Sequence, residues 1–141
     1  FMLYFHFYII FFYIMLEQIH ISIGELWDKF TILLIKKDKI NDEDKKKHVM
    51  NEIKVLTTNM DKYSYHDHEL FIELKEINLA LWDIEDRLRI KELNQCFDDE
   101  FILLARSVYT TNDKRAEIKY KINTLYGSSI FEVKDYVKYH S

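Results

Sequence analysis

The chain contains no proline and only two glycines among its 141 residues. Sandwiches, barrels and doubly wound α/β folds need both residue types repeatedly, because proline and glycine set the backbone angles of tight turns. Hydrophobic residues make up 48% of the chain and charged residues 31%, which supports a hydrophobic core and argues against disorder. We therefore expect one mainly α-helical domain of ordinary size.

Residues 1–14 differ in composition from the rest, since they carry no charge and eight of the chain's 22 aromatic side chains. The apolar run ends at Leu16, short of the roughly 20 residues of a spanning helix, and it lacks the features of a signal peptide. Three interpretations stay open: translated non-coding sequence ahead of a start at Met15, a short membrane anchor over residues 1–16, and a core strand. We treat 1–14 as a non-native or anchor-like extension and 15–141 as a single helical domain.

The segment 17–23 alternates apolar and polar side chains, which predicts a short N-terminal strand. Ser22 and Glu25 form a capping box, so a helix should begin near Ile23. The apolar residues of this helix extend nearly all round it, which is typical of a helix that is central or covered by a partner. A second helix should follow the polar break at Asn41.

The strongest pattern in the chain predicts a long helical hairpin over about residues 70–125. The first helix of this hairpin has apolar residues alternately four and three apart: Leu70, Leu74, Ile77, Leu81, Ile84 and Leu88. After a turn at 94–98 the spacing recurs as far as Leu125, and a last short helix is expected after Ser129. Short connections make successive helices antiparallel neighbours, so we expect a small antiparallel helical bundle dominated by this hairpin.

Polar residues interrupt the apolar seam of the second hairpin helix at Arg115 and the residues before it. Because the turn is centred near residues 96 and 97, Arg115 should face Asn78. A buried guanidinium without a partner is costly, so we expect Arg115 to pair with Glu85 or Asp86. The same layer should contain Trp82.

Two interpretations of this polar layer stay open. The favoured one is a structural salt bridge that sets the register of the helices, with Trp82 stacked on Arg115. The other is a pocket in which Arg115, Lys114 and Asn112 hold a phosphate or carboxylate beside Trp82. The residues of this hypothetical ligand site are Asn112, Asp113, Lys114, Arg115, Asn78, Trp82, Glu85 and Asp86.

Signals for other chemistry are weak. Cys96 is the only cysteine, which excludes an internal disulfide and a cysteine-based zinc site and fits a reducing, cytoplasmic location. His66 and His68 lie two residues apart, where side chains on a helix diverge, so they indicate a solvated turn rather than a metal site. The net charge of −4 disfavours nucleic acid as a partner. We assign no catalytic residue, metal or cofactor.

Several segments resemble one known family: IGELWDKFTIL (Ile23–Leu33), LWDIEDRLR (Leu81–Arg89), FILLARSVYTTNDKRAEIKYKIN (Phe101–Asn123) and GSSIFEVKDY (Gly127–Tyr136). They are similar to DUF6165, a family of short, uncharacterised bacterial and viral proteins, and the stretch around TNDKR is the most specific part. The family has no established activity, so no residue inherits a role. Its members tend to occur beside, or fused with, glycosyltransferase-type proteins, which implies a context of surface-glycan synthesis.

Two functions follow as expectations. The first is a non-catalytic accessory or interaction protein in a surface-glycan context, which binds a protein partner or a second copy through one face of the first helix. This face comprises Leu26, Trp27, Phe30 and Leu34. The alternative is a binder of, or an enzyme acting on, a phosphorylated or sugar-nucleotide ligand at the Arg115 layer. A solvent-reaching pocket at Arg115 would favour the alternative, and a packed salt bridge would favour the first function.

Overall fold

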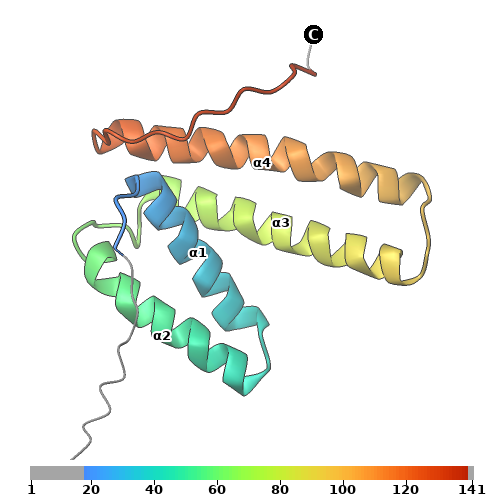
Figure 1. Ribbon diagram of the computed structural model, residues 1–141, viewed down its shortest axis with the longest axis horizontal. Coiled ribbons are helices and arrows are strands. Elements are labelled where there is room, and N and C mark those ends of the chain that lie inside the picture. The colour runs from blue at the N-terminus through green and yellow to red at the C-terminus, as the bar shows by residue number, and fades with distance from the viewer. Residues whose placement is uncertain (1–17, 140–141) are drawn as a thin grey trace, which may run out of the picture.

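The computed structural model describes residues 18–139, and within this range the chain forms four helices (Figure 1). Their bounds are α1 (Ile23–Lys39), α2 (Glu43–Met60), α3 (Glu69–Leu93) and α4 (Asp99–Leu125). The helices α3 and α4 form the expected antiparallel hairpin. Helix α1 packs against the other three helices, whereas α2 packs against α1 alone. The mainly helical fold predicted from the sequence is confirmed.

Polar side chains begin three of the four helices. Ser22, Asp42 and Asp98 each accept a hydrogen bond from the backbone N–H three residues further on, at 2.9–3.1 Å. Such bonds satisfy backbone donors that have no partner inside the helix. The fourth helix, α3, begins after His68, whose Nδ1 accepts from the backbone N–H of Leu70 at 3.2 Å. The predicted helix start near Ile23 is therefore confirmed.

The predicted N-terminal strand is wrong where the structure describes it. Residues 18–22 carry no strand, and Ile23 already belongs to α1. A single strand would leave its backbone groups without a ladder partner, whereas the same segment ending at Ser22 caps a helix. The extension 1–14, and the anchor proposed for residues 1–16, lie outside the described residues.

The expected last helix is also wrong, because residues 127–139 form an extended segment that runs back along α4 (Figure 1). We call this segment the C-terminal strap. Glu132 of this segment forms an ion pair with Lys119 of α4, with 2.8 Å between Oε2 and Nζ. The ring of Phe131 lies against Tyr120, with centroids 5.3 Å apart. Side-chain contacts to α4 therefore hold the strap in place, and the strap forms no helix of its own.

The hydrophobic core lies where α1 crosses the hairpin, and Trp27 of α1 is fully buried at its centre. Four rings surround the indole, with centroids 5.3–6.4 Å away and planes inclined by 64–83° to the indole plane. They belong to Tyr63, His68, Phe71 and Tyr126. Such tilted contacts match the charge distribution of aromatic rings. The aromatic cluster joins α1, the α2–α3 loop, α3 and the end of α4.

The face of α1 that was expected to bind a partner is covered by the chain itself. Leu26, Trp27 and Phe30 belong to the core, and Leu34 is half-buried against it. Three of these four side chains are therefore packed inside the fold, and Leu34 alone keeps part of its surface exposed. The reason is that α1 is the central helix of the fold. A wide apolar surface is expected of a central helix as well as of a helix covered by a partner.

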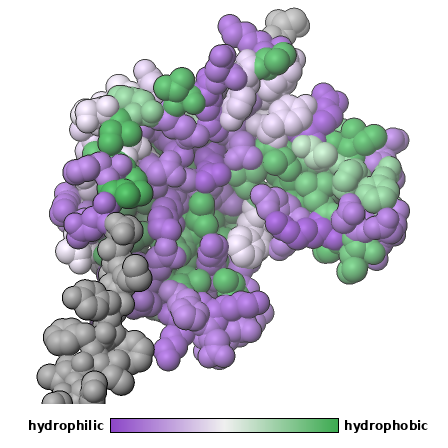
Figure 2. Space-filling model, viewed as in Figure 1, coloured by the Kyte–Doolittle hydropathy of each residue, from purple (hydrophilic) through white to green (hydrophobic). Residues whose placement is uncertain are grey.

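The half of the α3–α4 hairpin next to its turn projects beyond α1 and α2 (Figure 1). Figure 2 shows hydrophobic residues gathered on this projecting end. The exposed apolar side chains there are Ile90, Leu93, Phe97, Ile102 and Leu103. Between residues 18 and 139 no helix combines the length and the apolar character that crossing a membrane requires.

Candidate functional site

Arg115 of α4 pairs with Asp28 of α1, so the predicted pairing with Glu85 or Asp86 is wrong. The Nε of Arg115 donates to Oδ1 of Asp28 at 2.8 Å, and its Nη2 donates to Oδ2 at 2.5 Å. This two-point geometry is the strongest form of a carboxylate–guanidinium contact. Glu85 and Asp86 lie on an exposed face of α3, where both contact Arg89.

The expected register of the hairpin is confirmed by Asn78, which reaches the same carboxylate as Arg115. The Nδ2 of Asn78 donates to Oδ1 of Asp28 and to Oγ1 of Thr31, each at 2.9 Å. Thr31 in turn donates to the backbone carbonyl of Asp28 at 2.8 Å. The buried carboxylate therefore has a cationic partner and an amide partner, which offset the cost of removing it from water.

Asp28 is the functional residue that sequence reasoning missed. Its side chain is only 3% exposed, and the Arg115 side chain is 27% exposed. The hydrogen bonds that Arg115 donates to Asp28 raise the pKa of Arg115, so the guanidinium stays charged despite burial. A carboxylate beside Trp27, in a helix that is apolar nearly all round, was the signal that could have found it.

A close approach of α1 to α4 at Gly24 positions this ion pair. The backbone N–H of Gly24 donates to Oδ1 of Asn123 at 2.7 Å. A Cβ atom at position 24 would lie 2.6 Å from the carbonyl oxygen of Lys119 and 2.8 Å from that Oδ1. Only glycine therefore lets the two helices approach this closely. Because Asp28 lies one turn further along α1 on the same face, the close approach brings it to Arg115.

Lys119 extends the charged contact toward the strap. Its Nζ lies 2.6 Å from Oε2 of Glu25, 2.8 Å from Oε2 of Glu132 and 3.9 Å from Oδ2 of Asp28. Burial lowers the pKa of Lys119, but hydrogen bonds to Glu132 and Glu25 outweigh this effect and the pKa is raised. The same bond to Lys119 lowers the pKa of Glu132. The ammonium group thus binds the strap to α4.

Two hollows lie side by side between α4 and the strap. The first, the polar cleft, has a volume of about 210 Å³ and is lined by Glu25, Arg115, Ala116, Lys119, Glu132 and Lys134. The second, the strap cavity, has a volume of about 590 Å³ and is lined by Val108, Tyr109, Asn112, Asp113, Lys134, Tyr136, Val137 and Tyr139. Lys134 lines both. Arg115 therefore belongs to a packed ion pair and also borders a hollow.

The structure brings only some of the predicted site residues together. Asn112 joins the Arg115 layer, since its Oδ1 accepts from Nη1 of Arg115 at 3.3 Å. Asp113 accepts a hydrogen bond from the hydroxyl of Tyr139 in the strap. The remaining predicted residues lie apart from the ion pair: Lys114 is exposed on α4, and Trp82 is half-buried on α3 without stacking on Arg115. The part of the chain described here contains no cluster of His, Cys, Asp or Glu that could hold a metal ion.

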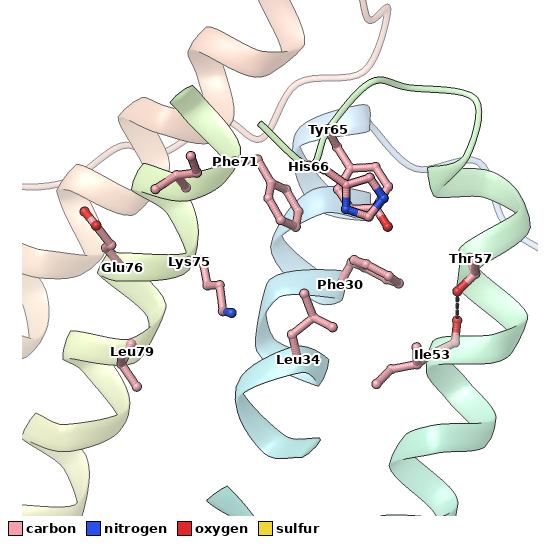
Figure 3. Close-up of a pocket in the computed structure, with 11 residues that line it drawn as sticks. Phe30, Leu34, Ile53, Thr57, Tyr65, His66, Phe71, Lys75, Glu76 and Leu79 are labelled. Carbon is pink, nitrogen blue, oxygen red and sulfur yellow. Dashed lines mark hydrogen bonds between the residues drawn. The ribbon is translucent and has the colours of Figure 1, made fainter. Parts of the chain in front are cut away.

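A third feature is a groove of about 670 Å³ between α2 and α3, with α1 as its floor (Figure 3). We call it the apolar groove. In Figure 3, Phe30 and Leu34 project from α1 between Ile53 of α2 and Leu79 of α3. The other residues of the lining are Thr57, Tyr65, His66, Phe71, Ile72, Lys75 and Glu76.

Between residues 18 and 139 the fold and these sites define a small helical protein with a buried ionic contact between its central helix and its hairpin, an apolar groove and the C-terminal strap. The chain belongs to the family of unknown function DUF6165, whose model matches residues 17–141. This match confirms the resemblance found in the sequence. No curated protein and no solved structure matches the chain.

Proposed function

We propose that the protein is a non-catalytic interaction protein that pairs with a second copy of itself through the apolar groove, and that it works beside enzymes of surface-glycan synthesis. The groove carries the proposal. The glycan setting rests on the occurrence of family members next to glycosyltransferase-type proteins, which is an association and supplies no mechanism.

The groove has the form of a site for one more helix. Helix α2 packs against α1 alone, so its side toward α3 has no helical neighbour within residues 18–139. An amphipathic helix in the groove would cover Ile53 on one side and Ile72, which is 46% exposed, on the other. Helix α2 itself offers a matching stripe, since exposed Met50 continues the line of Ile53 and Thr57 at helical spacing.

Charge complementarity favours a second copy as the occupant. The N-terminus of helix α2 carries the acidic residues Asp42, Glu43 and Asp44, and the basic run Lys45–Lys47 follows them directly. The first two turns of α3 carry Glu69, Glu73 and Glu76, with Lys75 among them. The loop of residues 61–68 joins the end of α2 to the start of α3 (Figure 1). If two α2 helices pack antiparallel about a two-fold axis, the lysines of each copy come beside the glutamates of the other.

The oligomeric state of the protein in solution tests this proposal by light scattering and sedimentation. Reversal of the basic run (Lys45→Glu, Lys46→Glu and Lys47→Glu) should give a monomer, and so should Glu73→Lys with Glu76→Lys. Both sets of changes in one chain should restore the dimer, because the charge pairs re-form with opposite sign. If the wild type stays monomeric up to about 1 mM, the dissociation constant of any dimer is higher than in most specific associations. That result would refute the dimer.

A matched pair of apolar substitutions locates the interface. Ile72→Asp places a charge in the groove and should dissociate the dimer, whereas Leu103→Asp, on the projecting end of the hairpin, should leave it intact. Dissociation by Leu103→Asp alone would move the interface to the hairpin. Proximity labelling in the native host should enrich glycan-building enzymes, and enrichment of unrelated proteins only would contradict the proposed setting.

A further inference from the structure

The polar cleft and the strap cavity share one lining residue, Lys134, so they are two adjoining parts of the hollowed surface between α4 and the strap. One part is lined by aromatic rings with an amide and a carboxylate, and the other by ammonium and carboxylate groups. We propose that this hollow binds a sugar phosphate, with the sugar ring in the strap cavity and the phosphate in the polar cleft. The proposal does not depend on dimerisation.

The strap cavity suits a sugar ring because it combines aromatic faces with acceptors. Tyr109 and Tyr136 are both exposed lining residues, and an exposed ring can pack against the C–H surface of a sugar. One face of the Tyr136 ring carries Nζ of Lys134, 5.6 Å from the ring centroid. Asp113 offers two carboxylate oxygens, and only one of them accepts the hydroxyl of Tyr139. Sugar hydroxyls are donors that such acceptors bind, whereas the carbonyl-rich edge of a pyrimidine base would face the carboxylate with like partial charge.

The polar cleft suits a phosphate because the strap already places an anion there. One carboxylate, Glu132, contacts two ammonium groups: Nζ of Lys119 at 2.8 Å and Nζ of Lys134 at 3.6 Å. A phosphate has more acceptor oxygens and more charge than this carboxylate, so it can take the same two partners. Arg115 keeps its pair with Asp28, so the net positive charge of the cleft comes from Lys119 and Lys134, and Glu25 keeps its contact to Lys119. Binding therefore exchanges Glu132 for the phosphate.

Calorimetric titration of the full chain with four probes tests the assignment: glucose 1-phosphate, glucose, inorganic phosphate and uridine monophosphate. Glucose 1-phosphate should bind most tightly, because it alone fills both parts with matching chemistry. If inorganic phosphate binds as tightly as glucose 1-phosphate, the sugar subsite is refuted. If uridine monophosphate binds more tightly, the ring in the strap cavity is a base and not a sugar. The absence of heat from every probe at millimolar concentration would overturn the whole proposal.

Substitutions on the strap and on α4 separate recognition from stability. Asp113→Asn should weaken binding of glucose 1-phosphate about tenfold, since a charged acceptor is lost, and leave binding of inorganic phosphate unchanged. Glu132→Gln should strengthen binding of both phosphate probes, because the carboxylate no longer competes for Lys119. If Glu132→Gln weakens binding instead, the exchange is refuted.

Tyr120→Ala is the matched control, since it removes the ring contact to Phe131 of the strap but lies outside both hollows. It should leave affinity for glucose 1-phosphate within twofold of the wild type, whereas Tyr136→Ala should reduce it about fivefold or more, as expected for a lost aromatic contact. Equal losses in the two variants would show that only the order of the strap matters and would refute the sugar contact.

Discussion

Asp28 and Arg115, 87 residues apart in the chain, form a two-point ion pair with hydrogen bonds of 2.8 and 2.5 Å. The pair joins the central helix α1 to the second helix of the hairpin. Asn78 of α3 donates to the same carboxylate, so three helices meet at one buried side chain. Because the carboxylate of α1 is hydrogen-bonded by side chains of both hairpin helices, this layer sets how α1 lies across the hairpin.

Removal of one partner of this pair should be strongly destabilising. We expect Arg115→Ala to lower the free energy of unfolding by roughly 3–5 kcal/mol, because it leaves the Asp28 carboxylate buried with no cationic partner of equal geometry. Chemical denaturation measures the loss. Glu85→Ala is the control and should change stability by at most about 0.5 kcal/mol, since its contact to Arg89 is exposed.

The pair should also be non-additive. Arg115→Met combined with Asp28→Asn should cost clearly less than the sum of the two single changes, because the second change no longer strands a charge. Simple additivity would show that the two side chains do not depend on one another.

Gly24→Ala should destabilise the protein, although helix propensity alone predicts the opposite. Alanine favours a helix over glycine by about 1 kcal/mol. At position 24, however, the added Cβ would lie 2.6 Å from a backbone oxygen of α4, so the helices must separate. We expect a net loss of about 1–3 kcal/mol in chemical denaturation. A gain in stability would contradict the close approach of α1 and α4.

Gly127→Ala provides the comparison. No atom lies within 4 Å of a Cβ at this position, but its φ is +62°, which only glycine adopts easily. We expect a loss of about 1 kcal/mol from backbone strain alone. The position of Asp28 against Arg115 should then persist, whereas Gly24→Ala should shift the nuclear magnetic resonance signals of both residues.

The contact between the strap and α4 should weaken in alkali. The hydrogen bond to Asp113 raises the pKa of Tyr139 to about 12 from its ordinary value of 10.0. Because the folded value lies above the unfolded one, this contact contributes fully below pH 10.0 and is lost as the pH rises through about 12. Ultraviolet titration of the tyrosines follows the change. In Asp113→Asn the same group should titrate at lower pH, and an unchanged titration would refute the bond.

The apolar extension 1–14 should contribute little to the stability of the domain. The family model matches residues 17–141 and does not include the extension. Chains that begin at Phe1 and at Met15 should therefore unfold within a few degrees of one another, a shift equivalent to less than about 1 kcal/mol. A larger loss on truncation would show that the extension packs on the domain.

Much of the fold could be predicted because its signals are local. The caps at Ser22 and Asp42 act within one turn, and the four–three spacing from Leu70 to Leu88 acts along one helix. The hairpin register followed from the position of its turn, and it brought Asn78 and Arg115 into one layer as expected. The predicted strand and last helix failed, because 18–22 and the strap are held by a cap and by contacts to α4.

The sequence by itself indicated the four helices between residues 18 and 139 and that Arg115 must have a buried partner. The tertiary structure alone decided that this partner is Asp28, that Lys119 binds Glu132 of the strap, and that α2 and α3 leave a groove over α1. Periodicity and capping report on residues a few positions apart. The crossing of α1 over the hairpin depends instead on close packing at Gly24, and such packing joins residues whose separation in the chain carries no local signal.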